Sequence, residues 1–238
     1  MNRSDIRFDR ERFLEVHNYY KKFGLAPQTA QLRFETPIVA GKGFYEIHVN
    51  REGGVVQRIT ETWLKRNDAF VVKSLGVFLM IEDAAKVGSA PLMTYPLLQS
   101  DALPAGVAGF ATTDAEAIYN GTMSITTGQV ANFQGIPLRR FRHVPETQPV
   151  VSSGAPSGLI PQFSSDDMVL NLAERFVFAG TKDQKIRIEF PNNPNMNLAP
   201  GNSGFNAYIV VIADGWLVEG GTNHLFQEEG NPIGKAIL

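Results

Sequence analysis

Hydrophobic residues recur at every second position in several segments of this chain, and this period constrains its fold more than any other feature. Segments 32–35, 44–49 and 185–190 alternate apolar with polar side chains. Such alternation puts one face of a β-strand on a core and the other in water. Two longer runs, 68–83 and 206–218, are rich in β-branched residues, which favour buried strands. Because helices do not alternate with these strands, an α/β fold is excluded.

Eight principal strands with uneven connections predict an all-β fold, an eight-stranded antiparallel jelly-roll sandwich with an N-terminal amphipathic helix. Gly76 interrupts the first long run, where a β-bulge or a close backbone approach is expected, and Gly215 lies inside the second run. Segment 168–179 also fits a helical face, so strand and helix both remain open there. A short strand is expected near 59–64. The principal strands are expected at 31–39, 43–50, 68–82, 118–127, 131–143, 168–179, 185–191 and 206–219.

One segment near the start has helical periodicity. Asp9 is expected to cap the helix, Gly24 to close it in the left-handed conformation, and Pro27 to block its continuation. Residues 1–28 are therefore predicted to form a helical arm, and residues 29–238 the sandwich. The apolar stripe of this helix consists of Phe13, Val16, Tyr20 and Phe23.

A single amphipathic helix cannot bury its apolar stripe alone, so the arm must dock on its own sandwich, on a neighbouring molecule or on a lipid surface. The arm carries only a small excess of positive charge, which is too weak for strong attraction to anionic lipid. A contact with protein is therefore favoured.

Composition excludes several classes of protein. The chain has no cysteine, so disulfide scaffolds, thiolate chemistry and cysteine-ligated metal sites are excluded. Its formal net charge of −2 argues against a dedicated nucleic-acid binder. The chain lacks a run of about 18 apolar residues, and its first residues lack the apolar segment of a signal peptide.

Motifs for catalysis and for cofactors are not found. The chain has no phosphate-binding loop and no Gly-x-Ser-x-Gly elbow. His17, His48, His143 and His224 do not form pairs at ligand spacing, and acidic pairs such as Glu82-Asp83 are strand neighbours that point to opposite faces. We therefore expect no catalytic residue, no cofactor and no metal site, and a protein that is not an enzyme.

Two side-chain groups leave alternatives open. A sugar-stacking platform would form if several aromatic residues shared an exposed face, although packing in the core is favoured. These residues are Trp63, Trp216, Tyr45, Tyr95, Tyr119 and Tyr208, and a binding module would need an exposed cluster among Trp63, Tyr95, Tyr119 and Trp216. The basic segment 139–143 would meet phosphates, a subunit neighbour or solvent, and the last two are favoured. The candidate interface residues are Phe13, Val16, Tyr20, Phe23, Arg139, Arg140 and Arg142.

The arm at 13–23, the alternating strands at 32–35 and 186–189, and the long strands around Gly76 and Gly215 give a layout that resembles the jelly-roll capsid proteins of tailless icosahedral bacteriophages. Some members of that group enclose an internal membrane. Many have two rolls in one chain, whereas the strand count here favours one.

The resemblance implies a major capsid or vertex protein that assembles with copies of itself and with other virion proteins. It places the protein in the virion, after assembly in the host cytoplasm. The arm would face inward, toward an internal membrane or the genome, and no specific small-molecule ligand is implied.

Two other functions remain open. The first is a carbohydrate- or receptor-binding jelly-roll module, which would need an exposed cluster of the aromatic residues named above. The second is a β-sandwich hydrolase, which would need two carboxylates on separate strands that converge in space.

Overall fold

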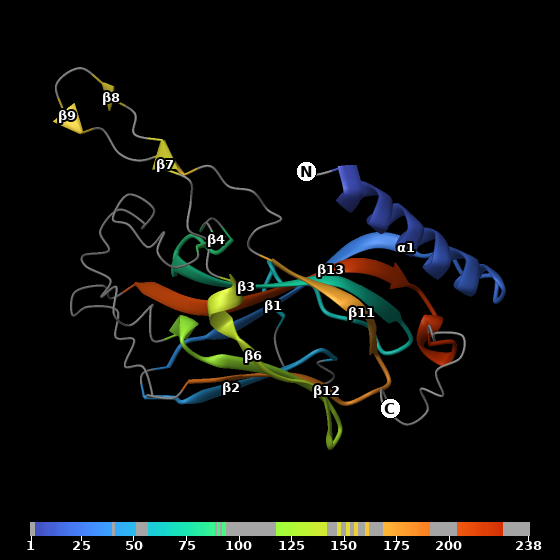
Figure 1. Ribbon diagram of the computed structural model, residues 1–238. Helices are drawn as coiled ribbons and strands as arrows, with labels where there is room; N and C mark the ends of the chain where they lie inside the picture. Colours follow the sequence, from blue (N-terminus) through green and yellow to red (C-terminus); the bar gives the residue numbers. More distant parts are fainter. Residues whose placement is uncertain are drawn as a thin grey trace.

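The computed structural model contains two antiparallel β-sheets that lie face to face and one N-terminal helix (Figure 1). The prediction of a mostly β protein with two such sheets and a helix at the start is therefore confirmed. The residues that the structure describes are 3–39, 41–50, 57–88, 90, 92–93, 118–141, 147–148, 151–152, 155–156, 160–161, 169–190 and 204–225.

The first sheet, sheet A, has the strand order β1-β13-β3-β11, and a short strand β4 pairs with β3. Its strands are β1 (Gln28–Pro37), β13 (Phe205–Val218), β3 (Ala69–Asp83), β11 (Val169–Ala179) and β4 (Leu92–Met93). The second, sheet B, has the order β2-β12-β5-β6. Its strands are β2 (Phe44–His48), β12 (Gln184–Glu189), β5 (Thr122–Thr127) and β6 (Val130–Pro137).

Short elements complete the described part of the chain. Two small ladders join β7 to β10 and β8 to β9. The remaining bounds are α1 (Arg3–Lys21), η2 (Leu138–Phe141), η3 (Gly221–Asn223), β7 (Thr147–Gln148), β8 (Val151–Ser152), β9 (Ala155–Pro156) and β10 (Ile160–Pro161).

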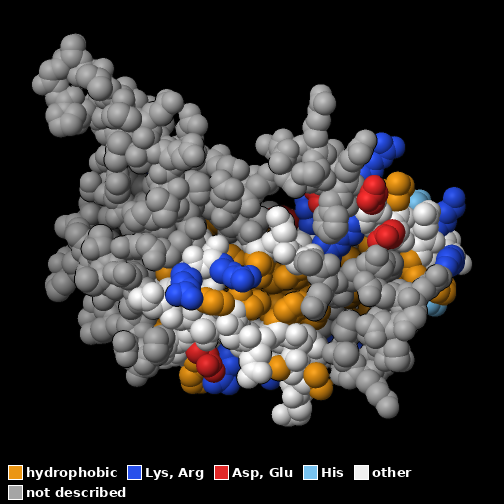
Figure 2. Space-filling model, in the orientation of Figure 1, with side chains coloured by type: hydrophobic (Ala, Val, Ile, Leu, Met, Phe, Trp, Pro, Cys, Tyr) orange, Lys and Arg blue, Asp and Glu red, His pale blue; other side chains and the backbone are white. Residues whose placement is uncertain are grey.

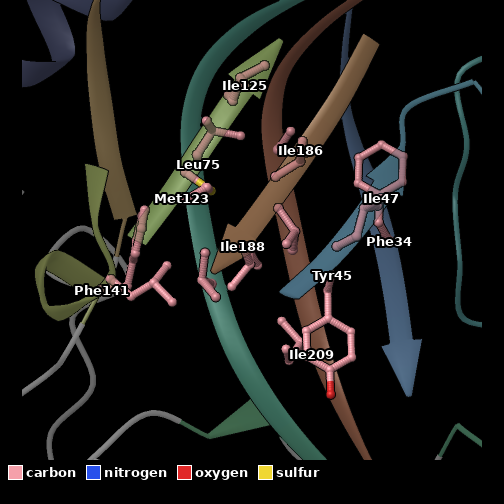
Figure 3. Packing of buried hydrophobic residues seen from close by; sticks show 14 of the residues in the cluster. Phe34, Tyr45, Ile47, Leu75, Met123, Ile125, Phe141, Ile186, Ile188 and Ile209 are labelled. Carbon is pink, nitrogen blue, oxygen red and sulfur yellow. The ribbon is translucent and has the colours of Figure 1, made fainter. Parts of the chain in front are cut away.

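The main core fills the space between the two sheets (Figure 3). Alternate residues of each strand point into it, as the period of two predicts. Ile186 and Ile188 of β12 face Leu75 of β3 and Ile209 of β13, and all are buried. Burying each such side chain contributes about 1.5–3 kcal/mol, which makes this core the main source of stability.

Each of the eight expected principal strands has a counterpart within a few residues. The open assignment at 168–179 is resolved as a strand, because Phe176 and Phe178 face the inter-sheet core while Val177 between them faces outward. Near 59–64 the described chain forms only an isolated bridge, between Thr62 and Arg33.

Several expected boundaries were wrong. The strand expected at 131–143 ends at Pro137, because Leu138 and Phe141 turn into the core from a 3-10 helix. The strand expected from residue 118 begins at Thr122. Asp9 does not cap α1, since the helix already includes Arg3.

The C-terminus of α1 is closed as expected. Gly24 has a φ of 74°, its N–H donates to Lys21 O, and the N–H of Leu25 donates to Tyr20 O. These two bonds form a Schellman motif, which satisfies the last carbonyls of the helix. A short connection then leads from Gly24 to β1 at Gln28. The division at residue 28 into an arm and a sandwich stays a prediction.

Candidate functional site

Helix α1 lies on the face of sheet A that points away from sheet B (Figure 1). Val16 and Tyr20 are fully buried there against Val71, Val177 and Trp216. Of the three docking surfaces considered from the sequence, the structure places the helix on its own sandwich. Phe13 is partly buried, with its ring 5.9 Å from that of Trp216. Phe23 is 44% exposed and stacks on His224 at 4.1 Å.

Arg12 fixes the helix to the sheet by a contact that the sequence did not reveal. Although it is charged, Arg12 is only 5% exposed. Its guanidinium donates to Leu172 O at 2.7 Å and to Val72 O at 3.1 Å, and it lies 5.9 Å from the Trp216 ring. The pairing of β11 with β3 breaks at this point. Arg12 therefore satisfies backbone acceptors where the strand ladder is interrupted.

The break in sheet A is a β-bulge at Lys73. On β13, Asp214 pairs with Ser74 and Gly215 pairs with Val72, so Lys73 is an extra residue in β3. Val72 and Leu75 both point into the inter-sheet core. The two residues between them lie on the helix side, where Lys73 Nζ approaches Asp9 Oδ2 at 2.6 Å.

Gly215 makes a close backbone approach that was not predicted for it. A Cβ atom at this position would lie 2.0 Å from Val71 O, so only glycine fits opposite the bulge. Gly76, in contrast, pairs in register with Ile212 of β13 and with Val169 of β11. The prediction of a bulge at Gly76 was therefore wrong.

A row of polar side chains crosses all four long strands of sheet A beside the bulge. Gln31 of β1 pairs with Asp214 of β13, Asp214 pairs with Ser74 of β3, and Ser74 pairs with Asn171 of β11. Gln31 Nε2 donates to Asp214 Oδ1 at 2.8 Å. The row separates the apolar cluster under α1 from a second outer cluster formed by Phe78, Met80, Tyr208, Val210 and Ile212.

The row and the N-terminal half of α1 enclose a groove of about 560 Å³. The helix contributes Asp9, Arg10 and Phe13 to its wall, and Trp216 contributes an aromatic ring. The volume lies within the range of small-molecule sites, about 300–1,000 Å³. The strands of the sheet position most of the polar groups, so this groove is the candidate functional site.

Two carboxylates on separate strands do converge elsewhere on sheet A, as a hydrolase would require. Glu35 of β1 and Glu82 of β3 both bind Arg58, which also contacts the Tyr208 hydroxyl. The side chains of the two glutamates are 0% and 1% exposed. Burial tends to lower the pKa of Arg58, but the hydrogen bond to Glu82 and the nearby charges outweigh it and raise the pKa.

Each oxygen of this carboxylate pair already has a partner. Glu35 Oε1 accepts from Arg33 and its Oε2 accepts from Arg58. Glu82 Oε2 accepts from Arg58 and its Oε1 accepts from the N–H of Gly88. A buried pair with its oxygens bonded in this way ties loops to the sheet rather than offering a base to a substrate.

The other sequence-predicted residues do not form one site. Trp63 packs partly buried on the core, Tyr119 is 1% exposed and Trp216 is 5% exposed, so these three make no exposed platform; Tyr95 lies outside the described residues. Arg139 and Arg140 are exposed on η2, whereas Arg142 and His143 lie outside the described residues. The interface residues therefore stay a prediction.

Within the described part of the chain, His, Asp and Glu side chains form no group suited to hold a metal ion. No described helix is long and apolar enough to cross a membrane. Comparison with protein-family models, curated proteins and solved structures finds no match for this chain.

Proposed function

We propose that the sandwich is a jelly roll. In chain order the eight principal strands are β1, β2, β3, β5, β6, β11, β12 and β13. The first pairs with the eighth (β1–β13), the second with the seventh (β2–β12), the third with the sixth (β3–β11) and the fourth with the fifth (β5–β6). These are the pairs of one long antiparallel hairpin. Rolling the hairpin up adds the contacts of the eighth strand with the third and the seventh with the fourth, which are the pairs β13–β3 and β12–β5.

We further propose that this roll is a structural subunit of an icosahedral viral shell. Double-sheet jelly rolls serve capsids, lectins and cupins, so the topology alone does not choose among them. The observation that carries the proposal is one edge of the sandwich, at which the exposed Arg139 and Arg140 lie beside apolar side chains. A second support is the state of the N-terminal arm, which is folded against its own sandwich by Val16 and Tyr20. Because α1 covers part of the outer face of sheet A, the edges of the sandwich stay accessible to other copies.

One edge of the sandwich has the character of a contact surface. Hydrophobic side chains gather there beside Lys and Arg, over β6, η2 and β11 (Figure 2). Phe133, Ile136 and Leu170 are partly buried and pack on the core, and Arg139 and Arg140 are exposed next to them. Arginine beside apolar surface is typical of protein interfaces. We assign this edge to contacts between copies.

Charge reversal tests the assignment. The double substitution Arg139→Glu and Arg140→Glu alters two exposed side chains, so it should leave the melting temperature within about 2 °C of the parent. It should lower the oligomer fraction in sedimentation velocity at high protein concentration, because acidic residues are disfavoured at interface cores.

The matched control is Lys21→Glu with Lys22→Glu, which makes the same charge change at exposed positions near the end of α1. This control should assemble like the parent. Equal loss in both variants would assign the effect to net charge, and unchanged assembly of the Arg139/Arg140 variant would remove this edge from the contact.

A further inference from the structure

The polar row of sheet A contains groups with no described bonding partner in the protein. Ser74 is only 4% exposed, yet no described group bonds to its hydroxyl. Asn171 of the same row and Thr29 beside it line the groove with unbonded side chains in the described structure. Asn171 and Thr29 are exposed, and the Ser74 hydroxyl is not among the buried atoms without a partner, so these groups are able to bond to water. A ligand in the groove would replace those water contacts with its own hydrogen bonds.

The chemistry of the wall defines the ligand class. Asp214 uses one oxygen for Gln31 and keeps its second as an acceptor, while Ser74 and Asn171 offer both donors and acceptors. A hydroxyl group also donates and accepts, so a polyhydroxylated ligand matches this mixture. Phe13, which is partly buried, and the small accessible part of Trp216 add an apolar part to the wall, suited to the C–H groups of a sugar ring.

Charge and length restrict the class further. The charged groups of the groove are Asp9, Asp214, Arg10 and Lys73, so acidic and basic groups balance. A balanced site gives no preference for an ionic ligand. The row crosses four strands, which at about 4.8 Å between strands extends over about 14 Å and gives room for more than one sugar ring.

We propose that this groove binds a short neutral oligosaccharide. The proposal does not rest on the shell function, because the groove belongs to a single chain and is built by its helix and its outer sheet. It gives the protein a recognition activity in addition to assembly. Ser74, Asn171 and Asp214 hold the hydroxyl groups, and Phe13 supplies the main apolar contact with the ring.

Binding of the labelled full-length chain to an array of neutral and acidic glycans, followed by calorimetric titration of the best neutral oligosaccharide, tests this. Ser74→Val and Asn171→Ala should each weaken binding about tenfold, since each removes a hydrogen bond to the ligand. Asn171 is exposed, so its substitution tests the site even if Ser74→Val disturbs folding. Thr126→Val on β5 of sheet B is the matched control and should bind like the parent.

Three results would overturn the proposal. The first is no binding of any neutral glycan at millimolar concentration. The second is binding restricted to sialylated or sulfated glycans. The third is undiminished affinity in Asn171→Ala and in every folded Ser74 variant.

Discussion

Arg58 joins two buried glutamates from strands that are not neighbours, and its loss would leave both charges without their shared partner. We expect Arg58→Met to lower the free energy of unfolding by about 3–5 kcal/mol, because breaking a buried ion pair leaves an uncompensated charge. Urea unfolding followed by circular dichroism measures this loss.

Arg187 is a control for this substitution. It also contacts two glutamates, Glu46 and Glu189, but its side chain is 44% exposed. Arg187→Met should therefore cost less than about 1 kcal/mol. A loss at Arg58 no larger than the loss at Arg187 would contradict the structural role given to the buried network.

Tyr45 makes stability depend on alkaline pH. Burial raises the pKa of Tyr45 above its ordinary 10.0, and its hydrogen bond with Val39 lowers the pKa in part. Above pH 10 the unfolded chain loses this proton first, so the unfolded state binds fewer protons. The contribution of Tyr45 is therefore complete below about pH 10 and is lost as pH rises through the raised folded-state pKa. Tyr19, whose pKa burial also raises, adds to the same loss.

The variant Tyr45→Phe checks this dependence. It should be less stable than the parent by about 1 kcal/mol at pH 8, because the bonds to Val39 are lost. Between pH 9 and 11 its stability should fall less steeply. Denaturant midpoints measured across that range give both values, and parallel pH profiles for the two proteins would refute the assignment.

At the scale of elements, the attachment of α1 depends on Arg12 as well as on its apolar stripe. Arg12→Met keeps much of the apolar contact but removes the donors to Leu172 O and Val72 O. Each carbonyl left unsatisfied costs about 1–3 kcal/mol, so the helix should undock more often. Hydrogen exchange of the α1 amides should become faster while that of β12 does not change.

Arg10→Met is the control on the same helix, since Arg10 is exposed. Its exchange rates should match those of the parent. If Arg12→Met also left α1 exchange unchanged, the helix would be held by Val16 and Tyr20 alone.

The elements of this fold were largely predictable, and the site was not. The alternation of apolar and polar residues located the strands, because in a strand every second side chain faces the core. Ser74 and Asp214 are visible in the sequence as polar residues inside apolar runs, and this was the signal that could have pointed to the groove. Their adjacency could not be found, because strand order and register bring together residues distant along the chain. The same holds for Arg12, whose partners are backbone carbonyls exposed by a bulge.

At the scale of the whole molecule, two face-to-face sheets and a docked N-terminal helix form one sandwich, and we propose one of its edges for contact between copies. The four nested strand pairs place the middle of the chain at β5–β6 and its distant segments together at β1–β13. The long β3 and β13 connect the groove region under α1 with the far end of sheet A. Assembly and recognition would therefore use different surfaces of the same sandwich.

Electron cryo-microscopy of the concentrated purified protein tests the central proposal most directly. The shell function predicts closed particles or symmetric rings, in which neighbouring copies meet at the edge formed by β6, η2 and β11. A sample that remains monomeric at the highest attainable concentration, with no ordered particles on the grid, would contradict it.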